Sequence, residues 1–372
     1  MTRTIIDIHV VQTVPPSNIN RDDTGSPKTA VYGGTRRARV SSQAWKRAVR
    51  NDFRAHLDAS ELGWRTKEIV ERLASSISDL APDLKTAAPE LAAAALKGAG
   101  ITTNSPKGKD AEMAEAGYLV FLSNTQYDNL AAAVVKAEGI GEKLGAKAAK
   151  SIVKTDHSID VALFGRMVAD SADLNVDAAC QVAHAISTHA VQTEFDYYTA
   201  VDDTKEREEL TGAGMIGTVE FNSATLYRYA TVDVDNLLEN LGDRQATARA
   251  VEAFVRSFVT SMPTGKQNSF ANRTLPDLVA VRLRATQSIN LVGAFESPIG
   301  VQQSEGRVRA SLVRLAAHTD ELEVAFSEAP EHAWFTAVGA SADGLDGFGE
   351  KLPFSDLTAT VRSAVEGRLG AQ

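Results

Sequence analysis

The sequence predicts an α+β fold in which a helical region is inserted between the strands of a sheet. Apolar and polar residues alternate near both ends of the 372-residue chain, as in strands that bury one face. Between them, residues 60–180 are rich in alanine, leucine, lysine and glutamate. Strands at both ends with helices between them favour an α+β sheet over a regular strand–helix–strand series. The length suggests two or three structural parts.

The N-terminal elements are predicted in the following order. Residues 4–14 alternate and form a first strand with one face on the core. Residues 15–34 are rich in Pro, Asn, Asp, Ser and Gly and predict a long loop. A short strand, Arg36–Val40, follows, and Ser41–Ser42 offers an N-cap for a helix over residues 43–56. The apolar stripe of that helix consists of Trp45, Val49 and Phe53.

The later elements return to strands. Several short helices are expected between residues 60 and 180, without an internal repeat. Alternation over Val219–Val232 predicts a long strand, and Leu278–Leu283 predicts another. Helical segments near residues 245–261 and 355–368 flank that last strand.

Composition is that of an ordinary soluble globular protein, with 44% hydrophobic and 23% charged residues. No apolar run is long enough to span a bilayer, and the N-terminus lacks a secretory pattern. The one cysteine, Cys180, allows neither an intramolecular disulfide nor a cysteine-based zinc site. We therefore expect a cytoplasmic protein without membrane contact.

Charge is distributed unevenly along the chain. The net charge is −9, yet residues 1–50 hold nine basic and three acidic side chains, a net of +6, so the rest carries −15. Such a local cationic patch suits a polyanion that is held in one place. Six of the basic residues lie within the segment Tyr32–Arg50: Arg36, Arg37, Arg39, Lys46, Arg47 and Arg50.

The start of the predicted helix can bind phosphate. Lys46 and Arg50, four residues apart, would share a helix face that Arg47 borders. The backbone N–H groups of Ser42 and Gln43 would point outward at the positive end of the helix. On the preceding strand two arginines would face one side of the sheet, and glycines before them would allow close approach of a ligand. These positions are Gly33, Gly34, Arg37 and Arg39.

The alternative for this basic segment is a surface helix whose charges serve only solubility. Clustering, the helix start and the local reversal of charge favour the phosphate role. These features do not separate RNA from DNA.

A glycine pattern invites a different function. Gly212–Gly217 matches the dinucleotide fingerprint, and Asp233 lies about twenty residues further on. That fingerprint requires a strand before it and a helix after it, whereas a charged segment precedes this one and a strand pattern follows. We interpret the glycines as part of a long hairpin.

Candidate metal ligands are equally weak. His184 and His189 would lie about 140° apart on a helix, whereas a helical zinc pair needs a spacing of four, so a core or capping role is favoured. Asp22–Asp23 could begin a two-metal nuclease site only if further carboxylates converged on it. Asp202–Asp203 is open to the same two interpretations, a metal site or a turn.

An ordered set of motifs carries a family resemblance, with matches running from residue 4 to about 280. The motifs are Asn20–Asp23, Gly33–Arg50, Asp160–Met167, Ala183–His189, Thr199–Asp203, Phe221 with Ser223, Tyr227–Ala230 and Lys266–Gln267. Together they resemble the backbone subunit of type I-E CRISPR Cascade, the CasC family of the RAMP superfamily. Each motif alone is weak, and the order of the set makes it specific.

The resemblance implies a modified RRM-like (ferredoxin-like) palm, an inserted helical fingers domain and a β-hairpin thumb. The palm would comprise residues 1–58 and 181–372, the fingers residues 59–180, and the thumb residues 194–224. It also implies an oligomer, with copies arranged head-to-tail along a guide RNA (crRNA) that pairs with target DNA, in contact with other Cascade subunits. Repetition of one heterologous contact generates such an open filament.

The resemblance further implies a non-catalytic, RNA-binding role in an antiviral defense ribonucleoprotein, without metal or cofactor. The implied RNA contacts are Arg21 and Lys28 in the loop, Ser42, Gln43, Lys46, Arg47 and Arg50 for phosphates, and Met167, Tyr198 and Ile216 against a displaced nucleotide. The alternative is a metal-dependent ribonuclease of a related CRISPR backbone family that uses Asp22 and Asp23.

Overall fold

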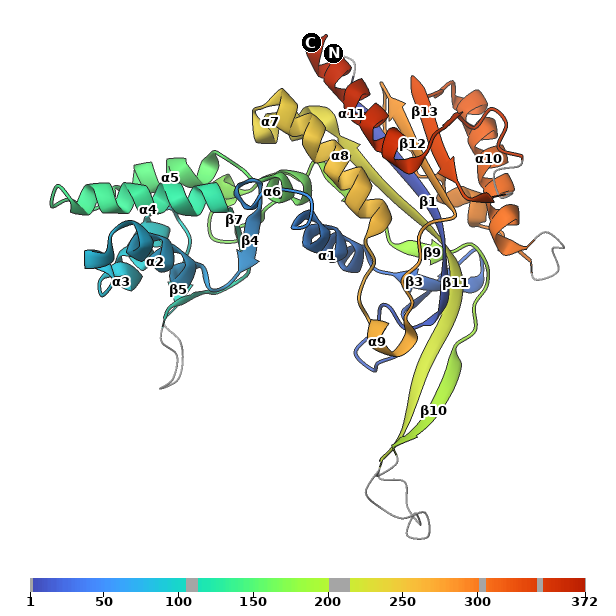
Figure 1. Cartoon of the computed structure of the whole chain (residues 1–372), viewed down its shortest axis with the longest axis horizontal. Coiled ribbons are helices and arrows are strands. Elements are labelled where there is room, and N and C mark those ends of the chain that lie inside the picture. The colour runs from blue at the N-terminus through green and yellow to red at the C-terminus, as the bar shows by residue number, and fades with distance from the viewer. Residues whose placement is uncertain (1–2, 105–112, 201–214, 301–305, 340–343, 372) are drawn as a thin grey trace. The chain divides into compact units, whose positions relative to one another are not determined.

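The computed structural model describes residues 3–104, 113–200, 215–300, 306–339 and 344–371, with the backbone alone at Ala200, Met215 and Ile216. Helices and strands are both abundant, so the predicted α+β class is confirmed (Figure 1). The chain divides into two compact units. Unit 1 comprises Met1–Asn51, Val182–Thr231 and Phe254–Ala364, and unit 2 comprises Asp52–Gln181, Val232–Ala253 and Val365–Gln372. The boundaries expected for palm, fingers and thumb stay a prediction.

Unit 1 is built on a mixed sheet, which has ten strands in the part of the chain that the structure describes. The strand order is β14-β13-β12-β1-β11-β9-β3-β2, and β8 and β10 also pair with β11. The strands are β1 (Ile5–Ser17), β2 (Thr29–Tyr32), β3 (Thr35–Val40), β8 (Cys180–Val182), β9 (Ala185–Ser187), β10 (Glu194–Ala200), β11 (Met215–Asp233), β12 (Leu278–Arg284), β13 (His332–Ala337) and β14 (Glu350–Lys351).

Helices accompany both faces of this sheet. They are α1 (Ser42–Phe53), α8 (Arg244–Thr260), α9 (Gln267–Phe270), α10 (Arg307–Phe326) and α11 (Phe354–Gly370), with a 3-10 turn, η4, at Leu291–Phe295. In one core cluster Val11 packs with Leu312 and Leu315 of α10. In another, Val14 packs with Trp45 of α1. Because these clusters lie on opposite sides of β1, the strand is buried on both faces, and the prediction of one core-facing side was wrong.

The N-terminal elements differ from prediction mainly in the expected loop. Residues 15–34 include the end of β1 and all of β2, which pairs antiparallel with β3. The predicted strand and helix that follow are confirmed as β3 and α1, although α1 ends at Phe53. Ser41 caps the helix by accepting a hydrogen bond from the amide of Ala44 at 3.4 Å. Trp45, Val49 and Phe53 are fully buried, as the predicted stripe requires.

Unit 2 is mainly helical, and its described residues also form two small sheets. Its helices are α2 (Ile69–Leu80), α3 (Ala88–Gly98), α4 (Asn124–Glu138), α5 (Ala146–Lys154), α6 (Ile159–Phe164) and α7 (Val234–Leu241). Antiparallel pairs are formed by β4 (Gly63–Thr66) with β7 (Val120–Ser123), and by β5 (Thr103–Asn104) with β6 (Glu115–Ala116). Single 3-10 turns lie at Ala59–Glu61, Pro82–Leu84 and Ala172–Leu174. Alanine positions such as Ala92, Ala95 and Ala131 are buried in its core, so the alanine-rich tracts are helix-packing surfaces.

A long hairpin extends from the sheet of unit 1 (Figure 1). Strand β10 pairs antiparallel with the first part of β11, from Glu194 opposite Phe221 to Ala200 opposite Met215. The glycine fingerprint therefore runs into a strand, and the helix that a dinucleotide site needs does not follow it. Gly212 and Gly214, like Asp202–Asp203, lie outside the described residues.

Among the described helices, none combines the length and apolar character that a membrane crossing requires.

Candidate nucleic-acid interface

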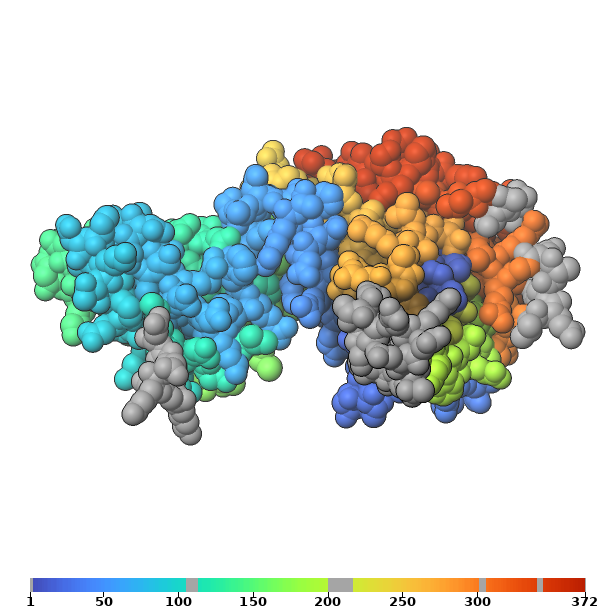
Figure 2. All heavy atoms as spheres, turned by 60° about the horizontal axis from the view of Figure 1, so that its bottom comes forward, coloured from blue at the N-terminus to red at the C-terminus, as the bar shows by residue number. Residues whose placement is uncertain are grey.

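A groove in unit 1 runs along the first turns of α1, and we call it the α1 groove. Its volume is about 480 Å³. It is lined by Ile19, Asn20, Arg21, Ser41, Gln43, Ala44, Arg47, Ala48, Asn51, Met262, Pro263, Thr264, Gly265 and Lys266. Three stretches of sequence far apart in the chain thus meet there. Figure 2 shows the gold segment that contains α9 beside dark-blue N-terminal residues of the same unit.

One wall of the groove is the helix α1. Gln43, Arg47 and Asn51 follow one another at a spacing of four, so they lie on one helix face. All three are exposed, and the residues between them in the lining, Ala44 and Ala48, have small side chains. The backbone amides of Ser42 and Gln43 have no hydrogen-bond partner among the described residues. This wall therefore combines a cation with the free donors of a helix start.

The opposite wall is the turn before α9. Lys266 adopts the left-handed conformation, with φ 51° and ψ 22°. That conformation costs a non-glycine residue roughly 1 kcal/mol or more. Gly265 lies so close to the Asn18–Ile19 backbone that a Cβ there would be 2.4 Å from the carbonyl oxygen of Ile19. Any residue with a Cβ would clash with that carbonyl, so this position requires glycine. The close packing places Lys266 at the groove.

The third part of the lining is the loop after β1. Arg21 and Pro27 form an isolated β-bridge, and the side-chain amide of Asn18 donates to the carbonyls of Gly25 and Glu220 at 2.9 Å each. Asp22 closes the turn by accepting hydrogen bonds from Thr24 and Ser26. The bond from the Thr24 hydroxyl is the main cause that lowers the pKa of Asp22. The loop is therefore an ordered element that holds Arg21 at the groove.

The electrostatics of the groove favour an anion. Among the residues that the structure describes, the cations of its lining are Arg21, Arg47 and Lys266, and the lining contains no aspartate or glutamate. In a protein with a net charge of −9, this is a local reversal of sign. Acidic surface elsewhere repels a polyanion while this groove attracts it.

The structure brings some predicted site residues together and separates others. Arg21, Gln43 and Arg47 line the groove, and Ser42 lies in the first turn beside it. Lys46 and Arg50 lie on α1 but outside the groove lining, and both have interactions within the protein. The spacing in the sequence had placed these two on one helix face, with Arg47 at its border. Their predicted role stays a prediction.

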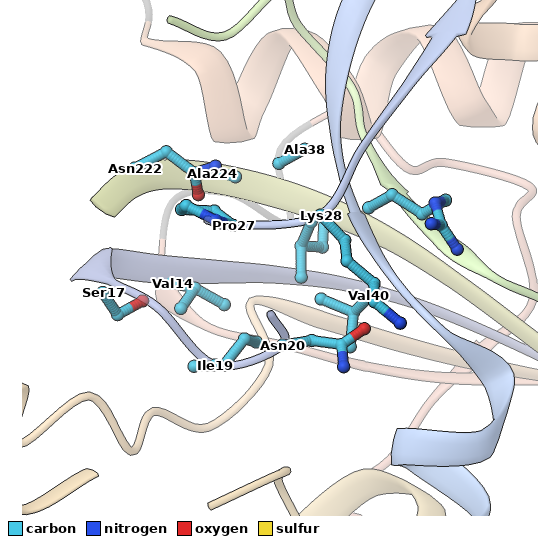
Figure 3. A pocket seen from close by; sticks show the side chains of 12 residues that line it. Val14, Ser17, Ile19, Asn20, Pro27, Lys28, Ala38, Val40, Asn222 and Ala224 are labelled. Carbon is cyan, nitrogen blue, oxygen red and sulfur yellow. The ribbon is translucent and has the colours of Figure 1, made fainter. Parts of the chain in front are cut away.

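Lys28 lines a different, smaller pocket (Figure 3). Its walls include Val14, Val40 and Leu226, and Asn20 lies beside Lys28, whose amide donates to the Asn20 carbonyl at 2.9 Å. The cavity volume is about 20 Å³, which is room for one water molecule and too small for a nucleobase. Lys28 can therefore contribute charge at the surface, but the pocket beneath it is no base-binding site.

Two arginines of β3 were expected to face a ligand, and Arg37 does not. Arg37 is buried and donates to the carbonyls of Ser187, Phe295 and Glu296. Burial lowers its pKa. Arg39 is half-buried and bonds the Thr29 carbonyl. The prediction failed because unpaired backbone carbonyls nearby need donors, and a planar guanidinium satisfies several at once.

The histidine interpretation also changes. His184 and His189 flank strand β9, so the helical geometry assumed for them was wrong. His189 is buried; its Nε2 accepts the amide of Thr225 at 3.1 Å and its Nδ1 donates to the Ala190 carbonyl at 2.9 Å. His184 contacts Arg39 at 3.1 Å. No three histidine, cysteine, aspartate or glutamate side chains converge on a metal-sized site within the described ranges.

The remaining predicted contacts lie in other parts of the chain. Met167 belongs to unit 2 and is 78% exposed. Tyr198 lies on the hairpin, opposite Gly217, and a Cβ on that glycine would meet the Tyr198 ring at 2.5 Å. Ile216 pairs with Thr199 through the backbone, and its side chain lies outside the described residues.

Several candidate residues escaped the sequence analysis. Phe195 and Tyr197 are 67% and 64% exposed on the hairpin face opposite to Tyr198, since side chains alternate along a strand. Lys266, Thr264 and Asn51 complete the groove. Lys266 was part of a motif of the family resemblance but was not assigned as an RNA contact, and a turn such as Pro263–Lys266 is common in any loop.

An α+β unit with a cationic groove at a helix start has the features of a polyanion-binding protein. Comparison with known proteins gives the family. The profile described as "CT1975-like protein" matches residues 6–358, so the chain belongs to that family. No curated protein sequence matches the chain.

Solved structures agree with this membership. A chain of the structure titled "CRISPR RNA-guided surveillance complex, pre-nicking" is 34% identical, with a TM-score of 0.81, over 97% of this chain and 100% of that one. A chain of "CRISPR RNA-guided surveillance complex" is 30% identical, with a TM-score of 0.63, over 97% of this chain and 99% of that one. The resemblance predicted from the ordered motifs, to the Cascade backbone subunit, is confirmed.

Proposed function

We propose that the chain is a non-catalytic crRNA-binding backbone subunit of a type I-E CRISPR surveillance complex. The single observation that carries the proposal is the α1 groove, where three cations line a surface beside the two free backbone amides at the start of α1, and where the described residues of the lining include no carboxylate. The titles of the similar structures, each an RNA-guided surveillance complex, support the same conclusion.

The proposed arrangement assigns the palm to the sheet of unit 1, the fingers to the helices of unit 2 and the thumb to the β10–β11 hairpin. Copies would bind head-to-tail along the guide RNA in the cytoplasm, together with other subunits of the complex. The protein would grip the RNA backbone, and sequence would be read by pairing between the guide and target DNA. A groove that contacts phosphates suits this division, because phosphate contacts position a strand without reading its sequence.

Purification of the expressed protein provides the direct test. We expect RNA of a defined length to co-purify, and the mass of the particle to correspond to several copies on one RNA. Recovery of an RNA-free protein that binds no added single-stranded RNA would overturn the proposal. Cleavage of complementary RNA with divalent metal, lost on Asp22→Ala, would favour the ribonuclease alternative.

The hairpin offers a second prediction. Tyr198→Ala should weaken binding of single-stranded RNA by roughly five- to a hundred-fold, because a stacked base contributes about 1–3 kcal/mol. Fluorescence anisotropy with a labelled RNA measures the change. The matched control is Tyr197→Ala, the same side chain one residue away on the other face, 64% exposed against 40% for Tyr198. Equal losses in the two variants would show that the assigned face is wrong.

A further inference from the structure

The α1 groove contains neutral hydrogen-bonding side chains as well as cations. Asn20, Ser41, Gln43, Asn51 and Thr264 all line it. Two of these five are already used within the protein: the Asn20 side-chain oxygen accepts the amide of Ser41 at 2.8 Å, and the Ser41 hydroxyl caps α1. Gln43 lies in the first turn with the free amides, where it belongs to the phosphate site.

The other two, Asn51 and Thr264, are exposed, and their side chains have no hydrogen-bond partner in the described part of the chain. Asn51 lies one helical turn beyond Arg47 on the α1 wall. Thr264 lies two residues before Lys266 on the opposite wall. Each wall therefore presents a cation and, within four residues of it in the sequence, a side chain that can both donate and accept a hydrogen bond.

A ribonucleotide strand offers partners for both kinds of side chain. A cation pairs with a phosphate, and the next polar group along the strand is the ribose. The ribose 2′-hydroxyl is both donor and acceptor, and it is the group by which a protein distinguishes RNA from DNA at a given site.

We propose that Asn51 and Thr264 make the groove selective for RNA over DNA by hydrogen-bonding ribose 2′-hydroxyl groups, an inference that rests on the proposed RNA-binding function. In an assembly that holds an RNA guide paired with a DNA strand, this selectivity assigns the groove to the guide. Two such hydrogen bonds give roughly a ten- to hundred-fold preference for RNA over DNA of the same sequence.

The test compares RNA and DNA oligonucleotides of one sequence, with the intact protein freed of bound nucleic acid. The double variant Asn51→Ala/Thr264→Val should lose roughly ten-fold or more in RNA affinity and leave DNA affinity unchanged. Both positions are exposed, so circular dichroism should remain that of the wild type. Asn268→Ala, an exposed asparagine of α9 outside the groove, is the matched control and should keep the preference. Lys266→Ala should weaken RNA and DNA alike.

Two outcomes overturn the inference and are distinguishable. Wild-type protein that binds both oligonucleotides equally, or a double variant that keeps the RNA preference, would refute the selectivity while leaving RNA binding in place. Wild-type protein that binds neither would refute the proposed function and the selectivity with it. RNA with 2′-O-methyl groups provides a further arm: it removes the donor, so its affinity should fall toward that of DNA.

Discussion

Replacing Arg21, Arg47 and Lys266 together by alanine should weaken binding of single-stranded RNA by roughly a hundred-fold at physiological salt. These are the three cations that line the α1 groove. Each phosphate neutralised by a protein cation releases condensed counterions, so affinity falls as salt rises, with a slope of about −0.7 per contact for single strands. Removal of three contacts should make the slope shallower by about two units. A salt titration by fluorescence anisotropy measures both quantities.

The matched control removes three cations elsewhere. Lys85, Lys147 and Arg244 are exposed and lie in unit 2. The triple alanine variant at these positions changes the net charge by the same amount, so it separates local contact from general attraction. If it lowered the affinity and the salt slope as much as the groove variant does, RNA would be held by overall charge, and the groove would lose its assigned role.

A second comparison concerns Lys46 and Arg50, the two residues that the helix spacing placed on one face of α1. Lys46→Ala/Arg50→Ala removes cations of α1 that lie outside the groove lining. We expect a smaller loss than for Arg47→Ala with Lys266→Ala. A larger loss would mean that the RNA backbone follows the Lys46 face of the helix, as the helix spacing alone had suggested.

The sequence predicted the elements of the site better than their spatial arrangement. Helix α1 could be placed because Ser41–Ser42 is a strong cap and Trp45, Val49 and Phe53 mark a stripe. The sequence could not show which basic side chains of α1 lie at a groove, since that depends on the turn before α9, more than two hundred residues away. The packing of Gly265 against the Ile19 carbonyl places that turn opposite the Arg47 face.

The burial of two arginines is a second feature that the sequence could not predict. Arg37 and Arg228 look like surface cations in any pattern of charges, yet each is buried and satisfies backbone carbonyls. Both arginines donate to backbone carbonyls that the tertiary structure would otherwise leave without a hydrogen-bond partner. The periodicity of the sequence does not show which carbonyls these are. By contrast, the long strands β11 and β12 were predictable because alternation and β-branched residues act locally.

Arg228→Ala should lower the free energy of unfolding by about 3–5 kcal/mol, because it leaves a cavity and removes the donor of two buried acceptors. Arg228 is 1% exposed on β11. Its guanidinium donates to the side chain of Gln12 and the carbonyl of Phe258, and it stacks over the ring of Trp45, 3.7 Å from the centroid. Burial lowers its pKa to about 9, which still leaves it charged at neutral pH.

Arg228 therefore connects α1 and α8 to the sheet. The shape of the groove depends on the position of α1, because α1 forms one of its walls. Urea denaturation of the RNA-free protein, followed by tryptophan fluorescence, measures the loss. Arg228→Met separates charge from volume: an apolar side chain of similar length often replaces a buried charge at little net cost. It should therefore recover part of the lost stability. The exposed Arg36→Ala is the control and should stay within about 0.5 kcal/mol of the wild type.

Measurements of RNA binding distinguish the loss of stability in the Arg228 variants from a displacement of α1. If Arg228→Met keeps α1 in place, its RNA affinity should remain close to that of the wild type, while Arg228→Ala should lose both stability and affinity. An Arg228→Ala protein as stable as the wild type would refute the network. A stable Arg228→Met protein that fails to bind RNA would mean that packing volume alone does not position the helix, and that the guanidinium contacts with Gln12 and Phe258 set the position of Arg47 in the groove.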